Sequence, residues 1–123
     1  MCRTAKVRLG NLGVNCLLQD QTGFLWAGTE NGLYRYDGQS FTAFGVAEGL
    51  PSEHILSLLQ TADGTLWVGT LRGLAQQVGV AFRPVPAGTR AAVSSMASDA
   101  GGGLYLGTSD GLVSGHRDAA AGT

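Results

Sequence analysis

The side chains that could do chemistry in this sequence gather in short glycine-rich polar segments, where turns and loops are expected. Carboxylates, an amide, an imidazole and guanidinium groups could together hydrogen-bond a small polar ligand, because binding residues commonly sit on loops of a rigid scaffold. The predicted ligand-binding residues are Glu30, Asn31, Glu53, His54, Arg72, Arg90 and Asp110. The alternative is that each of them is a solvated turn residue.

Catalytic and metal sites are not predicted. His54 and His116 have no acid at a fixed spacing, so both are expected to be surface histidines rather than bases or metal ligands. Calcium would need more oxygen ligands than surround the aspartates next to the predicted hairpins, which are Asp20, Asp63 and Asp99. The sequence contains no nucleophile elbow, no closely spaced carboxylate pair and no phosphate-binding glycine loop. We therefore expect no enzyme activity, cofactor or metal.

A repeat must position these residues, and it occupies most of the chain. The frame Gly-x-Leu-Trp-x-Gly-Thr-x-x-Gly-Leu begins at Gly23 and again at Gly64, and a third copy from Gly102 has Tyr105 in place of tryptophan. The spacing of about 40 residues is typical of propeller blades. The sequence therefore predicts an all-β partial β-propeller of about three four-stranded antiparallel blades, with the third blade incomplete.

The predicted blades cover residues 12–45, 54–86 and 91–116, and residues 117–123 are expected to form a disordered tail. In each blade a short apolar strand and a hairpin precede the strand that carries the repeat frame. The ligand-binding residues then fall on one face, which carries the connections between the second and third strands and those between blades.

The connection between the second and third strands contains Asn31-Gly32 in the first copy and Asp110-Gly111 in the third. Both dipeptides predict a type I′ turn, in which the two central residues have φ > 0. Arg72-Gly73 of the second copy suits that turn poorly, so a three-residue or bulged hairpin is expected there.

Six residues of the repeat frame are predicted to be structural. Large flat rings provide surfaces on which blades can stack. A glycine inside a strand makes room for a close neighbour, and we expect that neighbour to be the ring two residues away. These structural residues are Trp26, Gly28, Trp67, Gly69, Tyr105 and Gly107.

Other side chains are assigned to packing with less direct support. Cys16 stands where the other copies have serine, so we expect a small buried packing residue; a disulfide to Cys2 is the less favoured alternative. Tyr34 and Tyr36 share one face of their strand, with Arg35 on the other. The tyrosines are expected to pack between blades, and the alternative is a platform on which a sugar ring stacks.

The overall composition excludes some partners. A formal net charge of -1 with 14% charged residues offers neither a basic surface for nucleic acid nor a polybasic patch for membranes. No apolar run is long enough for a signal peptide or a membrane span, so with Met1 as the natural start the chain is expected to be soluble and not exported.

The segment Gly23-Phe-Leu-Trp-Ala-Gly-Thr-Glu-Asn-Gly-Leu-Tyr-Arg-Tyr-Asp-Gly38 resembles the two-component regulator propeller repeat, as do Leu-Leu-Gln-Asp20 before it and Gly49-Leu-Pro-Ser52 after it. The resemblance covers about residues 12–112. It implies the periplasmic sensor region of a bacterial histidine kinase or diguanylate cyclase receptor, which binds a small extracellular ligand. The third copy departs from the family pattern at Tyr105, and the second lacks the Tyr-Arg-Tyr-Asp of the first, so no ligand contact is carried over.

Three blades are fewer than the four to eight that close a common propeller. The end blades would then expose tryptophan-bearing surface, so we expect either a fragment of a longer sensor, completed by further blades, or a chain that associates with copies of itself. Two other functions stay open: a fragment of a quinoprotein-type or lyase propeller enzyme, suggested by Asp20-Gln-Thr-Gly-Phe-Leu-Trp26, and a structural scaffold for a protein partner.

Overall fold

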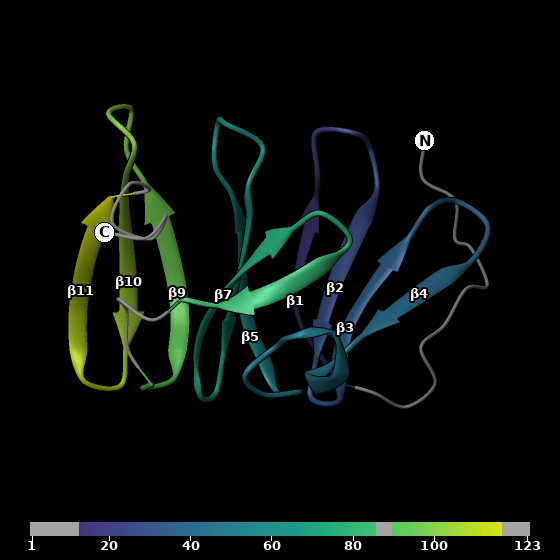
Figure 1. The fold of residues 1–123 in the computed structure, drawn as a ribbon, viewed down its shortest axis with the longest axis horizontal. Helices are drawn as coiled ribbons and strands as arrows, with labels where there is room; N and C mark the ends of the chain where they lie inside the picture. Colours follow the sequence, from purple (N-terminus) through teal and green to yellow (C-terminus); the bar gives the residue numbers. More distant parts are fainter. Residues whose placement is uncertain (1–12, 86–89, 117–123) are drawn as a thin grey trace.

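Three antiparallel sheets stand side by side in the computed structural model, which describes residues 13–85 and 90–116 (Figure 1). We call them blades one, two and three. Blade one contains β1 (Val14–Gln19), β2 (Leu25–Thr29), β3 (Gly32–Tyr36) and β4 (Phe41–Phe44). Blade two contains β5 (Ile55–Gln60), β6 (Leu66–Thr70), β7 (Gly73–Val78) and β8 (Ala81–Pro84). Blade three contains β9 (Val93–Ser98), β10 (Gly103–Thr108) and β11 (Gly111–His116).

The predicted fold class is confirmed: the structure is an all-β partial propeller in which each strand pairs with the next along the chain. Within the described residues the third sheet has three strands, as an incomplete blade should. The predicted tail at residues 117–123 lies outside the described residues. In residues 13–85 and 90–116, no helix has the length and apolar character needed to cross a membrane.

The connection from the second to the third strand is the same in all three blades, and the type I′ prediction is wrong. No described residue other than glycine has positive φ, so Asn31 and Asp110 do not adopt that turn. The threonine that ends the second strand closes the turn instead. Thr29 Oγ1 accepts a hydrogen bond from Asn31 N (3.0 Å) and donates one to Gly32 O (2.8 Å).

The same threonine pattern recurs in the other two blades. Thr70 Oγ1 accepts from Arg72 N and donates to Gly73 O, while Thr108 Oγ1 accepts from Asp110 N and donates to Gly111 O. The expectation that Arg72-Gly73 would need a different turn is therefore also wrong. The threonine hydroxyl and the following glycine define the turn, and the two residues between them differ from blade to blade.

The first strands of successive blades lie side by side and are joined by hydrogen bonds between blades. Asn15 Nδ2 donates to Ile55 O at 2.8 Å, and Ser57 Oγ donates to Val93 O at 2.8 Å. Each acceptor carbonyl belongs to the first residue of the next blade's first strand. These bonds fix the relative height of neighbouring blades.

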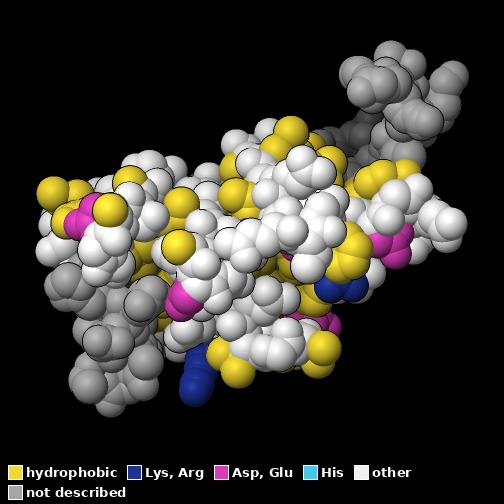
Figure 2. Space-filling model, turned by 90° about the horizontal axis from the view of Figure 1, so that it is seen from above, with side chains coloured by type: hydrophobic (Ala, Val, Ile, Leu, Met, Phe, Trp, Pro, Cys, Tyr) yellow, Lys and Arg dark blue, Asp and Glu magenta, His cyan; other side chains and the backbone are white. Residues whose placement is uncertain are grey.

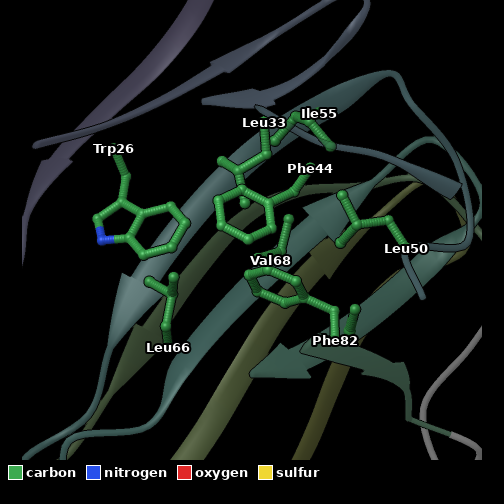
Figure 3. Packing of buried hydrophobic residues seen from close by; sticks show 9 residues of the cluster. Trp26, Leu33, Phe44, Leu50, Ile55, Leu66, Val68 and Phe82 are labelled. Atoms are coloured by element: carbon green, nitrogen blue, oxygen red, sulfur yellow. The ribbon is translucent and has the colours of Figure 1, made fainter. Parts of the chain in front are cut away.

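Blades one and two share a buried apolar core (Figure 3). Trp26 and Phe44 of blade one meet Phe82 of blade two, with ring centroids 6.1 and 5.4 Å from it and near-perpendicular ring planes. Leu66 and Val68 of blade two complete this cluster, which is almost free of solvent contact. A second cluster joins blades two and three in the same way, with Trp67 of blade two facing Leu104 and Leu106 of blade three.

The glycine inside each second strand is indeed closely packed, but its neighbour is not the ring that we expected. A Cβ on Gly28 would lie 2.6 Å from Cys16 Sγ and 2.6 Å from Ile55 Cγ2. A Cβ on Gly69 would likewise collide with Ser57 Oγ and Val93. At Gly28 and Gly69, glycine is therefore required because a small side chain of the first strand and the first residue of the next blade both reach this position; at Gly107 only Ser95 does so.

Arg35, rather than Tyr34 or Tyr36, lies on the face of blade one that packs against blade two. Its guanidinium carbon is 5.0 Å from the ring centre of Phe24 and 5.7 Å from that of Trp26. Tyr34 and Tyr36 point to the opposite face, where both contact the ring of Phe41. The tyrosines therefore do not pack between blades one and two; they lie on the outer face of blade one.

The tryptophans also lie differently from the prediction that the end blades expose them. Trp26 faces blade two and Trp67 faces blade three, and each is almost fully buried. Tyr105 is the ring at the equivalent position that remains exposed, on the outer face of blade three.

Candidate ligand-binding site

The crossing from blade one to blade two and the β2–β3 type of turn lie at the same end of the sheets, as the sequence predicted (Figure 1). The crossing from blade one to blade two follows β4 and contains a short 3-10 helix, η1 (Val46–Glu48). Glu48 folds back on the start of this helix, where its Oε1 accepts a hydrogen bond from Gly45 N at 2.5 Å.

Two contacts fix the crossing loop to its surroundings. Gly49 has φ of 109° and approaches β8 so closely that a Cβ would collide with the carbonyl oxygen of Phe82. Leu50 is buried in the core shared by blades one and two. At the far end of the loop, Gly32 N donates to Glu53 O at 2.6 Å, which ties the loop to the β2–β3 turn.

The loop and the turn together enclose a pocket of about 320 Å³. That volume is at the lower end of the range for small-molecule sites. The residues that line it are Asn31, Tyr34, Ala43, Phe44, Gly45, Val46, Ala47, Glu48 and Glu53.

The polar groups of this pocket are mostly hydrogen-bond acceptors. Glu48 and Glu53 both lie beside Gly45: Glu48 accepts its amide hydrogen bond, and Glu53 Oε2 is 3.1 Å from where a Cβ would be. The lining residues include no Lys or Arg, so the pocket favours a neutral or cationic ligand over an anion. Tyr34 contributes an aromatic ring, and its hydroxyl lies 3.4 Å from Asn31 O.

Of the predicted ligand-binding residues, the structure brings Asn31 and Glu53 together in this pocket. The other five, Glu30, His54, Arg72, Arg90 and Asp110, are not among its lining residues. The half-buried His54 uses its backbone to hold the crossing, accepting a hydrogen bond from Leu71 N at 3.0 Å and donating one to Ser52 Oγ at 3.1 Å.

The predicted ligand-binding residues did not include Tyr34, for which a sugar platform was only the alternative to packing, or Glu48, which was expected on the loop face but not selected. The spacing Gly45-Val-Ala-Glu48 is a usable signal for Glu48, because a glutamate three residues after a helix start commonly bonds back to it. For Tyr34 the signal is weaker: its alternation with Tyr36 suggested an aromatic platform, but the approach of the crossing loop is what makes its ring part of a pocket.

Hydrogen bonds also connect each repeat-frame ring to the first hairpin of its blade. Asp20 Oδ2 accepts from Trp26 Nε1, and Asp20 Oδ1 accepts from the backbone amides of Thr22 and Phe24. Partial burial raises the pKa of Asp20, but these hydrogen bonds and that from the Thr22 hydroxyl outweigh burial and lower it below the usual value. In blade three the Asp99 carboxylate accepts from the Tyr105 hydroxyl and raises the pKa of Tyr105.

Within residues 13–85 and 90–116, no three His, Cys, Asp or Glu side chains are grouped in a way that could hold a metal ion. Cys16 is a free thiol, and the cysteine of the alternative disulfide, Cys2, lies outside the described residues. Burial raises the pKa of the Cys16 thiol to about 11.

Two segments of the repeat are similar to a known family. Residues 8–31 and 49–72 match the family model described as "Two component regulator propeller". A search among curated proteins finds no match.

Solved structures similar to this chain include two extracellular domains from B. thetaiotaomicron. One is described as that of a hybrid two-component system, BT3049; it has a TM-score of 0.76 and 22% identity over 89% of this chain and 16% of its own. The other is described as that of a one-component system, BT4673, with a TM-score of 0.81 and 25% identity over 94% of this chain and 17% of its own. The chain thus spans about one-sixth of the length of the structures it matches.

Proposed function

The chain carries repeats of the two-component regulator propeller family, and from that premise we propose that it is part of the ligand-binding input region of a bacterial receptor. The location that goes with this proposal is the periplasm. A histidine kinase or a diguanylate cyclase, linked through the membrane, is the proposed output. The blades that complete the propeller come either from the rest of the parent protein or from other copies of this chain. The module itself is proposed to bind rather than to catalyse.

One observation carries the proposal of ligand binding. The pocket between the β2–β3 turn and the η1 loop combines a concave shape with two carboxylates, an amide and an aromatic ring. Loops held on a rigid sheet are the usual place for a ligand site. Here Gly32 N and Gly49 attach the loop to both neighbouring blades, so a ligand in the pocket would act on the junction between them.

The ligand class that suits this pocket best is a saccharide. Sugar hydroxyl groups are donors, and Glu48, Glu53 and the Asn31 side chain offer acceptors for them. Tyr34 offers a ring face against which the apolar side of a sugar can pack. In a receptor, such a ligand would shift the packing of two sensor copies only through a difference in its affinity for the two arrangements.

The test is a thermal-shift screen of the 123-residue chain with neutral oligosaccharides, followed by calorimetric titration of any sugar that raises the melting temperature. Glu53→Gln and Asn31→Ala should each weaken binding at least about tenfold, the loss expected for a hydrogen bond to a charged or well-placed polar group. Asp110→Asn is the matched control, because Asp110 lies on the same loop end but does not line the pocket. This control variant should bind like the wild type.

The outcomes separate the functions that the sequence left open. Binding that Glu53→Gln and Asn31→Ala leave unchanged would contradict the pocket, although a sensor with another site would survive. Stabilisation by no sugar, together with capture of a protein partner, would favour the structural scaffold. A characteristic quinone absorbance after incubation with the cofactor would favour the quinoprotein enzyme.

A further inference from the structure

The two end faces of this stack of blades expose apolar side chains. On the outer face of blade one, Leu17 and Leu25 are 63% and 38% exposed. On the outer face of blade three, Tyr105 and Leu112 are 36% and 77% exposed. Figure 2 shows hydrophobic side chains at the end of the molecule that blade three forms, on the left. Exposed apolar surface of this kind marks an interaction site.

The positions exposed on blade one are those that blade two uses to receive blade one. The strand registers make Leu17 equivalent to Leu58, because each pairs with the residue after the tryptophan of its second strand. They make Leu25 equivalent to Leu66, because each pairs with the last residue of its first strand. Leu58 and Leu66 both pack in the core shared by blades one and two. The outer face of blade one is therefore a copy of a face that already binds a blade.

The positions exposed on blade three are those that blades one and two offer to the following blade. Tyr105 is equivalent to Trp26 and Trp67, and Leu112, paired with Gly107, is equivalent to Leu33, paired with Gly28. Trp26 and Leu33 are buried against blade two. The outer face of blade three is therefore equivalent to the face of blade one that packs against blade two.

The glycine position shows the match in most detail. At Gly28 a side chain from the next blade, Ile55, fills the space that a Cβ would need, whereas at Gly107 the nearest atoms all belong to Ser95 of the same blade. The residue of blade one equivalent to Ile55 is Val14, which is 48% exposed. Val14 of another molecule thus has the position and the exposure to cover Gly107.

We propose that blade three of one molecule docks onto blade one of a second copy of this chain, repeating the internal interface head to tail. In that complex Ser95 Oγ donates to the carbonyl oxygen of Val14 in the second copy, as Ser57 Oγ donates to Val93 O within the chain. Because the two faces differ, the contact is heterologous.

The experiment is sedimentation velocity on the 123-residue chain over a wide concentration range, with one charge placed on each face. Leu17→Arg alters blade one and Leu112→Arg alters blade three. Both side chains are exposed within the chain, so both variants should fold, which circular dichroism can check. Val80→Arg is the control, since Val80 is 90% exposed in the turn between β7 and β8, away from both faces.

We expect the wild type and Val80→Arg to associate with similar affinity. Each face variant alone should associate at least about tenfold more weakly, because its arginine would be buried at the interface without a partner. An equimolar mixture of the two face variants should form a dimer, since one interface between them contains neither arginine. A wild type that stays monomeric at every concentration would overturn the proposal. Association that only one of the two variants weakens would also overturn it, because that result indicates a face-to-face dimer.

Discussion

The indole nitrogen of Trp26 donates a hydrogen bond of 2.7 Å to Oδ2 of Asp20, six residues earlier in the chain. The same link recurs in each blade with different chemistry: Trp67 Nε1 donates to Thr61 Oγ1 at 3.1 Å, and the Tyr105 hydroxyl donates to Asp99 Oδ2 at 2.7 Å. The ring of the second strand is thereby held against the hairpin that precedes it. Tyrosine can replace tryptophan in blade three because its hydroxyl reaches the same acceptor.

This link should contribute measurably to stability. Asp20→Ala should lower the free energy of unfolding by about 1–2 kcal/mol, since it removes the acceptor of the indole hydrogen bond and of two backbone amides. In a double-mutant cycle with Trp26→Phe, the two changes should couple by about 1 kcal/mol, measured by urea unfolding of all four proteins.

Asp37 offers the control for that cycle. Its carboxylate accepts hydrogen bonds from the amides of Gln39 and Ser40 in its own turn, as Asp20 does, but it receives none from a ring within the described residues. Asp37→Ala and Trp26→Phe should therefore be additive within about 0.5 kcal/mol. Equal coupling in both cycles would show that the Asp20 result comes from the hairpin and not from the indole.

The threonine that closes each β2–β3 type of turn leads to a second prediction. Thr70 is fully buried, and its hydroxyl both accepts from Arg72 N and donates to Gly73 O. Thr70→Val keeps the shape but leaves both backbone groups without this partner, which should cost about 2 kcal/mol of unfolding free energy. Thr70→Ser keeps the hydroxyl and should cost well under half as much. If the valine and serine variants were equally stable, the hydroxyl would have no role in the turn.

Gly49 provides a third prediction, about the loop that forms the pocket. Gly49→Ala introduces a Cβ at φ of 109° and forces it against the Phe82 carbonyl oxygen, so the crossing loop must leave blade two. We expect a loss of about 2–4 kcal/mol from backbone strain and overpacking together. The observable is the midpoint of urea unfolding.

Gly38 is a matched control for Gly49. Its φ of 102° is almost the same, but nothing lies within 4 Å of the position of its Cβ. Gly38→Ala therefore carries the backbone strain without the collision and should cost only about 1 kcal/mol. Similar losses in both variants would mean that the packing of Gly49 on β8 does not matter.

The arrangement of strands within a blade could be predicted from the sequence, whereas contacts between blades could not. Blade order and the order of strands within a blade followed from the repeat, because a spacing that recurs three times fixes which residues are equivalent. Contacts made between blades did not follow. These contacts depend on how one sheet packs against the next. Examples are the contact of Ile55 that requires glycine at position 28, and the placement of Arg35 on the face toward blade two while Tyr34 lines a pocket. The type I′ turn was predicted from Asn31-Gly32 alone, although the decisive hydroxyl was that of Thr29.

The candidate site shows the same division. Asn31 and Glu53 were found because they stand in turns at the loop end, a property that topology determines. Arg72 and Asp110 satisfied the same criterion and still lie outside the pocket, since each belongs to the turn of another blade. A sequence can therefore identify the end of the sheets that carries the loops, but the length and docking of one crossing loop decide which residues surround a cavity.

Cys16 leads to a fourth prediction, on the pH dependence of stability. Burial raises the pKa of its thiol from 9.0 to about 11, so between these two values the folded chain holds a proton that the unfolded chain has lost. Stability that is fully present below pH 9 must then fall as the pH rises toward 11. Because the thiol is only partly buried, the free energy of unfolding should drop from pH 8 to 10.5 by about 1 kcal/mol on account of this one group.

The Cys16→Ser variant isolates this effect, because serine already fills the equivalent positions 57 and 95 opposite their glycines. Both proteins should carry Cys2→Ser, so that a single thiol titrates. Urea unfolding at pH 8 and 10.5 should then show a steeper loss for the protein that retains Cys16, while Tyr105 and the other alkaline groups contribute equally to both. Equal slopes would mean that the thiolate is accommodated without cost, and hence that the space between Gly28 and Ile55 is open to water.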